Sequence, residues 1–102
     1  MARVVVMYKT PKDPAAFDRY YFATHVGIAK RIPGLRKYEV SRGAVASPAG
    51  ASGVELVAIL HFDDMAAVGR AFASDEGKAA VADVGTFTTG GVDILMFDNR
   101  EV

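Results

Sequence analysis

The chain has 102 residues, a size typical of one globular domain. Its 24% share of charged residues is ordinary, whereas its 51% share of hydrophobic residues is above the usual value. Twelve basic side chains balance twelve acidic ones, which argues against capture of nucleic acid or of an anionic membrane by charge. The absence of cysteine excludes disulfides and thiolate metal sites.

The first expected element is a strand over Val4 to Tyr8, a continuous β-branched and aromatic run of the kind that is covered on both faces. The apolar run is too short for the core of a signal peptide or for a membrane span. We therefore expect a cytoplasmic protein that does not associate with membranes.

A helix is expected to begin at Asp13-Pro14, because aspartate caps helices and proline suits their first position. We expect it to end at about Arg31 or Ile32, before the helix-breaking pair Pro33-Gly34. One apolar stripe recurs at three- and four-residue steps along it, formed by Phe17, Tyr20, Tyr21, Thr24, Ile28 and Ile32.

Two strands and a loop should follow. Leu35 to Val45 resembles a strand with imperfect alternation, whereas Val54 to Phe62 alternates clearly between two faces. Between them, Ala46 to Gly53 is small and rich in Pro, Gly and Ser, which predicts a flexible hairpin loop. The sequence leaves open whether this loop is a lid or only a tether.

The C-terminal part should contain two further helices and a last strand. Asp63 is expected to cap a helix, and Asp64 beside it is also read as a cap rather than as half of a catalytic pair. Ser74 should start another helix that ends near Val84, and Val92 to Phe97 should form the strand. The order β-α-β-β-α-β predicts a ferredoxin-like α+β fold, with four antiparallel strands and helices on one face. We expect one domain over residues 1–102.

The sheet face without helices should be unusually apolar, because the first and last strands are apolar on both sides. Val5, Val57, Ile59 and Leu95 are the residues expected there. A monomer rarely leaves such a face in water. We therefore predict a homodimer through the sheet face.

Three segments together resemble the EthD family, within the dimeric α+β-barrel group. They are the run KTPKDPAAF (residues 9–17), the Tyr-Tyr…His helix that leads into IPGLRKYEV (32–40), and the segment from HFDDM to SDEGKAAVAD (61–83). His25 matches the helix histidine of the family pattern, although Gly27 stands where many members have proline.

The resemblance implies the same fold, a homodimeric barrel and a role in small-molecule catabolism or biosynthesis. Better-understood relatives in the group include cofactor-free monooxygenases and isomerases or cyclases that act on aromatic or polyketide-like compounds. On this basis we expect no cofactor.

His25 is the candidate general acid/base, because imidazole exchanges protons near neutral pH. At about 100° per residue it projects roughly 60–80° to one side of the apolar stripe, which is a boundary position. Asp83 is a candidate carboxylate partner that would orient His25. Tyr21 and Tyr38 are candidate substrate-binding groups in a mostly apolar pocket suited to a small hydrophobic ligand.

Each of these residues also has an interpretation that is structural rather than catalytic. His25 would also be satisfied by a hydrogen bond to a neighbouring carbonyl or carboxylate, and Asp83 would also suit a helix end. His61 is better placed on the sheet or dimer surface than in catalysis. The two histidines have no metal-ligand spacing and no third ligand, so we expect no metal site.

Two functions are therefore compatible with the sequence, beside a third and blander possibility, a stress-type barrel dimer with a vestigial pocket. One is a cofactor-independent oxygenase or an isomerase/cyclase that uses His25. The other is a non-catalytic binding or accessory protein for a hydrophobic metabolite or an oxidase system.

Overall fold

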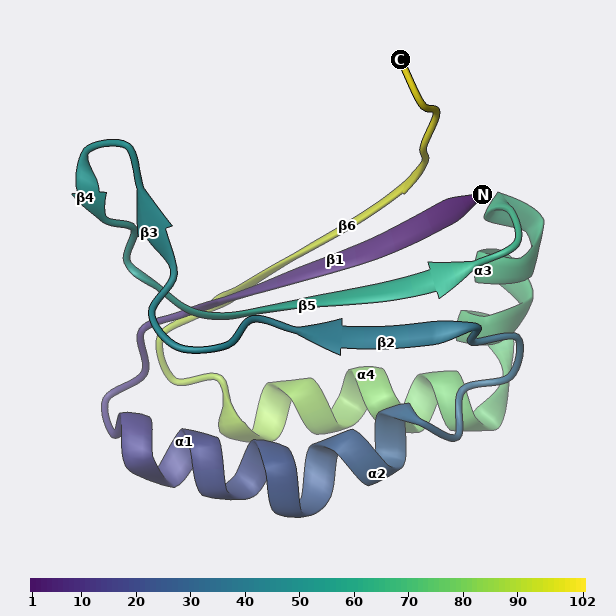
Figure 1. Ribbon diagram of the computed structural model, residues 1–102. Coiled ribbons are helices and arrows are strands. Elements are labelled where there is room, and N and C mark those ends of the chain that lie inside the picture. Colours follow the sequence, from purple (N-terminus) through teal and green to yellow (C-terminus); the bar gives the residue numbers. More distant parts are fainter.

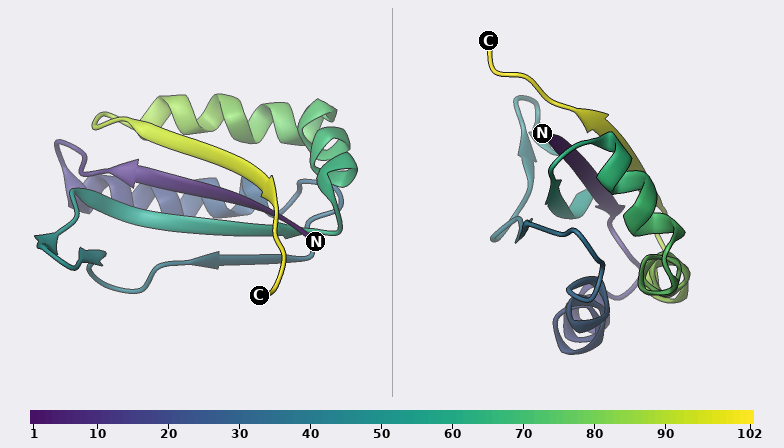
Figure 2. Two further views of the ribbon diagram at one scale, coloured as in Figure 1. Left: turned by 90° about the horizontal axis from the view of Figure 1, so that it is seen from above. Right: turned by 90° about the vertical axis from the view of Figure 1, so that its right-hand side faces the viewer.

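A four-stranded antiparallel sheet carries the helices on one of its faces (Figure 1), in a computed structural model that describes residues 1–102. The strands are β1 (Ala2–Lys9), β2 (Lys37–Val40), β5 (Val54–Phe62) and β6 (Val92–Asp98). Their order across the sheet is β2-β5-β1-β6. The predicted ferredoxin-like α+β fold is confirmed. The end view in Figure 2 shows no helix on the opposite face of the sheet.

The two central strands alternate between the faces of the sheet, as the period of a strand requires. Val4 of β1 pairs with Leu60 of β5, and Val5 pairs with Ile59. Val4 and Leu60 are buried under the helices, whereas Val5 and Ile59 are half-buried on the uncovered face. This register fixes which side chains of each strand reach the interior.

The first helical segment is not one continuous α-helix. It consists of α1 (Pro14–Tyr20), a π-helical turn η1 (Tyr21–His25) and α2 (Val26–Ala29). The Asp13 side chain caps α1 by accepting from the backbone N–H of Ala16, as predicted. The expected end at Arg31 or Ile32 was wrong, since α2 ends at Ala29.

The π turn changes which side chains face the core. The backbone N–H of Val26 bonds to the carbonyl of Tyr21, five residues earlier, so this turn is wider than an α-helical turn. Thr24 is exposed as a result, whereas His25 is buried. The predicted boundary position of His25 and the place of Thr24 in the stripe were therefore wrong.

The middle of the chain forms a shorter strand and a small hairpin. The strand expected over Leu35 to Val45 is limited to β2, and the hairpin pairs β3 (Ala46–Ser47) with β4 (Gly50–Ala51). Figure 1 shows this hairpin standing clear of the sheet on the side away from the helices. The predicted hairpin over Ala46 to Gly53 is thus present.

The C-terminal helices differ from expectation at two of their ends. Asp64, not Asp63, caps α3 (Met65–Ala73) by accepting from Ala67, while Asp63 receives two hydrogen bonds from Arg36. Ser74 caps α4 (Asp75–Phe87) as predicted. The helix α4 continues beyond Val84 because its last residue, Phe87, is buried in the core.

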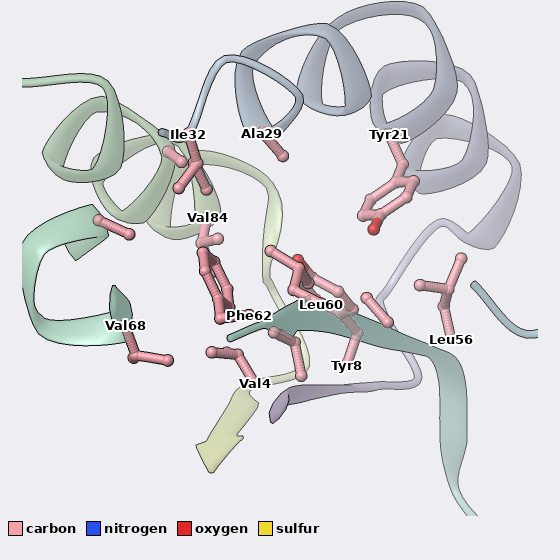
Figure 3. Packing of buried hydrophobic residues seen from close by; sticks show 14 of the residues in the cluster. Val4, Tyr8, Tyr21, Ala29, Ile32, Leu56, Leu60, Phe62, Val68 and Val84 are labelled. Atoms are coloured by element: carbon pink, nitrogen blue, oxygen red, sulfur yellow. The ribbon is translucent and has the colours of Figure 1, made fainter. Parts of the chain in front are cut away.

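The core lies between the sheet and the helices. Figure 3 shows Tyr21 directed from the helical layer toward the sheet, and Val4, Tyr8, Leu56 and Leu60 belonging to the sheet side of the same cluster. The ring centroids of Tyr8 and Tyr21 are 5.5 Å apart, within the range of favourable aromatic pairs. No helix of the structure is long and apolar enough to cross a bilayer.

The corner between α3 and α4 provides a test of this packing. A Cβ atom at Gly77 would lie 2.0 Å from the carbonyl oxygen of Ala71, so the backbone would have to move. We expect Gly77→Ala to lower the free energy of unfolding by about 1–3 kcal/mol, measured by urea titration followed by circular dichroism.

Gly85→Ala is the matched control in the same helix. A Cβ atom there meets nothing within 4 Å, so alanine should raise the free energy of unfolding by about 0.5–1 kcal/mol. Equal stability of the two variants would contradict the close approach of α3 to α4.

Candidate functional site

A histidine and an aspartate from different helical segments meet beneath the sheet. His25 Nδ1 lies 2.8 Å from Asp83 Oδ2, which joins the π turn to α4. His25 is only 4% exposed, and its ring packs 4.9 Å from that of Phe87. The structure therefore brings together the two residues that the sequence nominated as a pair.

Asp83 is held by more than one donor. The Tyr20 hydroxyl donates to Asp83 Oδ1 at 2.5 Å, and the Thr86 hydroxyl lies 3.4 Å from the same oxygen. Burial alone would raise the pKa of the Asp83 carboxyl, but the hydrogen bonds from Tyr20 and His25 outweigh it and hold this pKa below its usual value. The carboxylate form is the one that these donors stabilise.

The second ring nitrogen of His25 has no protein partner. No hydrogen bond joins Nε2 to another residue, yet the chain has no buried side-chain nitrogen or oxygen that lacks a partner. Nε2 must therefore keep some contact with open space. In the neutral ring that donates from Nδ1 to Asp83, this nitrogen carries the lone pair and can accept a proton.

Tyr21 and Tyr38 approach the same region from the π turn and from β2. Their hydroxyl oxygens are 2.5 Å apart, and the ring centroid of Tyr21 is 5.2 Å from that of His25. Burial is the main reason that the pKa of each phenol is raised. Both tyrosines are therefore neutral hydrogen-bonding groups at ordinary pH.

A cavity of about 40 Å³ lies between the helices and the sheet, and its wall includes His25, Tyr21 and Tyr38. Of the 15 residues that line it, 14 are hydrophobic. The predicted apolar pocket with few polar groups is thus present. Asp83 is not part of the wall and is connected to it through its hydrogen bond with His25.

Sequence reasoning missed two tyrosines. Tyr20 was assigned to the core, but its hydroxyl binds Asp83. Tyr8 was read only as a strand residue, but it lines the cavity beside Tyr21. The alternation of β1 could have indicated that Tyr8 faces the helices, whereas the contact of Tyr20 with Asp83 depends on how α4 packs.

His61 lies elsewhere, on the uncovered sheet face. Its Nε2 is 2.5 Å from Glu39 Oε1, and this hydrogen bond is the main reason that the pKa of the exposed Glu39 carboxyl is lowered. The surface position expected for His61 agrees with this placement. Nowhere do three His, Cys, Asp or Glu side chains gather closely enough to hold a metal ion.

The hairpin does not cover the cavity. None of the residues from Ala46 to Gly53 lines it. Ala46 and the residues from Gly50 to Gly53 instead border a separate, wider groove with Thr10, Asp18 and Phe22. Of the two roles considered for this loop, a lid over the His25 cavity does not fit its position.

Comparison with known proteins identifies close relatives. The family model described as the EthD domain matches residues 9–91. A Rhodococcus erythropolis protein, described as an uncharacterized 11.0 kDa protein in the thcB-thcC intergenic region, is 39% identical over 102 residues, covering 100% of this chain and 98% of its own. The crystal structure of an EthD family protein from Bacillus halodurans has a TM-score of 0.90 and 34% identity, covering 98% of this chain and 99% of that chain.

Two more distant structures share the fold. SnoaB from Streptomyces nogalater, described as a cofactor-independent oxygenase, has a TM-score of 0.68 at 19% identity, covering 99% of this chain and 94% of its own. A protein from Bacteroides fragilis, described as dimeric and of unknown function with a ferredoxin-like fold, has a TM-score of 0.65 at 16% identity, covering 96% and 95% of the two chains. Because the family model spans most of the sequence and two relatives exceed 30% identity over nearly its whole length, the chain belongs to the EthD family, as its motifs predicted.

Proposed function

We propose that the protein is a small cofactor-independent enzyme of the oxygenase or isomerase/cyclase type, which acts on a small hydrophobic or aromatic compound with His25 as acid/base. The observation that carries this proposal is the orientation of the His25 ring. Nδ1 is engaged by Asp83, and Nε2 is left without a protein partner in a residue that lines an apolar cavity. A ring held in this way is arranged for proton transfer.

Asp83 supports that chemistry as a positioning residue. By accepting from Nδ1 it selects the tautomer in which Nε2 is the base, and its negative charge stabilises the imidazolium that forms. Tyr20 and His25 together keep the pKa of Asp83 low despite its burial, so the carboxylate remains charged through the proton transfer.

Tyr21 and Tyr38 are the proposed substrate-binding groups. They are the polar neighbours of His25 in a wall that is otherwise almost entirely apolar. Such a wall favours a hydrophobic ligand body, while few polar groups set its orientation. Membership of the EthD family and the shared fold with a protein described as a cofactor-independent oxygenase support the proposed class.

We further propose that the protein is a homodimer through the uncovered sheet face. Val5, Val57, Ile59 and Leu95 lie on that face, and Leu95 is 51% exposed. The 28 residues of the four strands span roughly 450 Å² at ordinary strand spacing. Two such faces together give about 900 Å², close to the roughly 1,000 Å² that a specific interface needs. A structural neighbour is described as dimeric.

The acid/base role of His25 can be tested against its binding role. We expect wild-type protein to turn over a member of a panel of small aromatic and quinone-like compounds. His25→Gln should lower kcat by about 10²–10⁴-fold, because a positioned proton-transfer group contributes that much. Binding, measured by thermal shift or calorimetry, should survive the substitution.

His61→Gln is the matched control, since His61 is the only other histidine and does not line the cavity. It should retain turnover. Binding by the wild type without any turnover would favour the accessory-protein alternative. A His25→Gln variant that is merely less stable, with no ligand bound by either form, would make His25 a structural residue.

The lowered pKa of Asp83 predicts how stability depends on pH. A carboxyl whose pKa is depressed on folding stabilises the protein above its unfolded pKa, about 3.9, and loses this effect as pH falls through the folded pKa. Asp83→Asn should therefore cost about 1–3 kcal/mol at pH 7, and the difference from wild type should shrink below about pH 4. Urea unfolding at several pH values measures this.

The exposed Asp18→Asn change on α1 serves as the comparison and should alter stability little at any pH. A difference between wild type and Asp83→Asn that is constant from pH 7 to pH 3 would show that the charge of Asp83 does not contribute.

The dimer is tested by charging its interface. Leu95→Arg should convert a dimer of 10.9 kDa chains into a monomer at micromolar concentration, because an unpaired charge would have to be buried. Met65→Arg changes an exposed apolar residue on α3, in the helical layer, and should leave the dimer intact. Light scattering coupled to gel filtration gives the masses. A monomeric wild type would refute the proposal.

A further inference from the structure

Three tyrosines from three separate elements converge on the cavity. Tyr8 comes from β1, Tyr21 from the π turn and Tyr38 from β2, and all three line the wall. Tyr8 is only 2% exposed. Its hydroxyl lies near that of Tyr21 but forms no hydrogen bond of ordinary geometry with a protein group, and the chain has no buried side-chain oxygen without a partner. The Tyr8 hydroxyl must therefore touch open space.

The three hydroxyl groups carry more protons than the hydrogen bonds among them use. Each phenol carries one proton to donate. The Tyr21–Tyr38 hydrogen bond uses one of them, and no hydrogen bond joins any of the three hydroxyls to a fourth residue. Even one chain through all three oxygens would use two protons in two bonds. At least one phenolic proton is therefore free to meet a ligand atom in the cavity.

The three phenols remain donors over the ordinary pH range. Burial is the first cause that raises the pKa of Tyr8, and the nearby Tyr38 adds to it. Burial likewise raises the pKa of Tyr21 and of Tyr38. An unused donor and the unused acceptor Nε2 of His25 thus share one apolar wall, with the rings of Tyr21 and His25 5.2 Å apart.

We infer that the tyrosine cluster is an oxyanion-binding site, with Tyr8 as a member, and that the substrate is an enolisable carbonyl compound with an apolar body. The inference rests on the proposed role of His25. Nε2 takes a proton from the carbon beside the carbonyl, and the electron pair of that C–H bond forms a carbon–carbon double bond. The carbonyl π pair moves to oxygen, where the free phenolic proton binds the negative charge. Return of the proton to the same carbon restores the carbonyl and completes exchange, or epimerisation where the proton returns to the opposite face, so no oxidant is needed.

The size and the opening of the cavity define how such a ligand enters. A volume of about 40 Å³ is far below the roughly 150 Å³ of a cavity that holds benzene, so only the carbonyl end fits. Ile94 of β6 and Val81 of α4 are the exposed members of the wall, at 36% and 47%. The opening is therefore apolar and suits the body of the ligand.

The probe for this site is 4-phenylbutan-2-one, which joins a methyl ketone to an apolar ring. In D₂O, wild-type protein should accelerate deuterium exchange beside the carbonyl, followed by proton NMR. Tyr8→Phe should slow the exchange by about 100-fold, as expected for loss of one oxyanion donor, and His25→Gln should abolish the acceleration. Circular dichroism checks that both variants fold.

Binding provides a second readout that does not depend on turnover. Butylbenzene has the same apolar body without the oxygen. Wild type should bind the ketone about tenfold more tightly than butylbenzene, a difference of the size expected for one hydrogen bond, and Tyr8→Phe should lose this preference.

The outcomes separate this inference from the proposed function. Exchange that requires His25 but is unchanged in Tyr8→Phe would overturn the oxyanion site and leave His25 as the base. Equal binding of the ketone and the hydrocarbon by wild type would also overturn it. Ketone preference that depends on Tyr8, without any exchange, would keep the oxygen-binding site and count against His25 as the base.

Discussion

The hydrogen bond between His25 and Asp83 connects the two helical segments that cover the sheet, and the candidate site depends on it. It crosses 58 positions of sequence and lies beside the aromatic ring of Phe87. Because the ring is almost fully buried, each of its nitrogens needs a hydrogen-bond partner or contact with open space. One nitrogen is satisfied by the carboxylate, and the other has no protein partner in a ring that lines the cavity. The orientation of the imidazole is thus a consequence of packing and hydrogen-bond satisfaction together.

The two faces of the sheet have different roles in the molecule. Residues of β1 and β5 that face the helices form the core and the cavity, while their neighbours in sequence form the uncovered face. A single strand such as β1 therefore contributes Tyr8 to the site and Val5 to the proposed interface. Since successive side chains alternate strictly, neither surface can be shifted by one residue without altering the other.

Much of the fold could be predicted from the sequence, because it depends on local signals. The alternation of β5 and the caps at Asp13 and Ser74 each have a short-range cause. The EthD motifs supplied His25, and the pairing of His25 with Asp83 was anticipated. The burial of His25 was not, since it depends on the π turn, and the roles of Tyr8 and Tyr20 were missed because they arise only when β1, η1 and α4 come together. Asp63 and Asp64 were both expected to act as caps, because two adjacent aspartates offer the same local signal, and only Asp64 does.

The π turn has one more consequence, which concerns insertions and deletions. An α-helical hydrogen bond spans four residues, and the bond from Val26 to Tyr21 spans five, so this segment accommodates one residue more than a regular helix would. Removing a single residue between Tyr21 and Val26 would let the helix become regular and would leave Phe17 and Ala29 on the same face, because the wide turn already absorbs that residue. Closing the turn to α-helical geometry without a deletion would instead rotate the preceding side chains by roughly 100° relative to those that follow. Homologues that are one residue shorter within this stretch should accordingly keep both flanking faces toward the core and have a regular helix in place of the π turn.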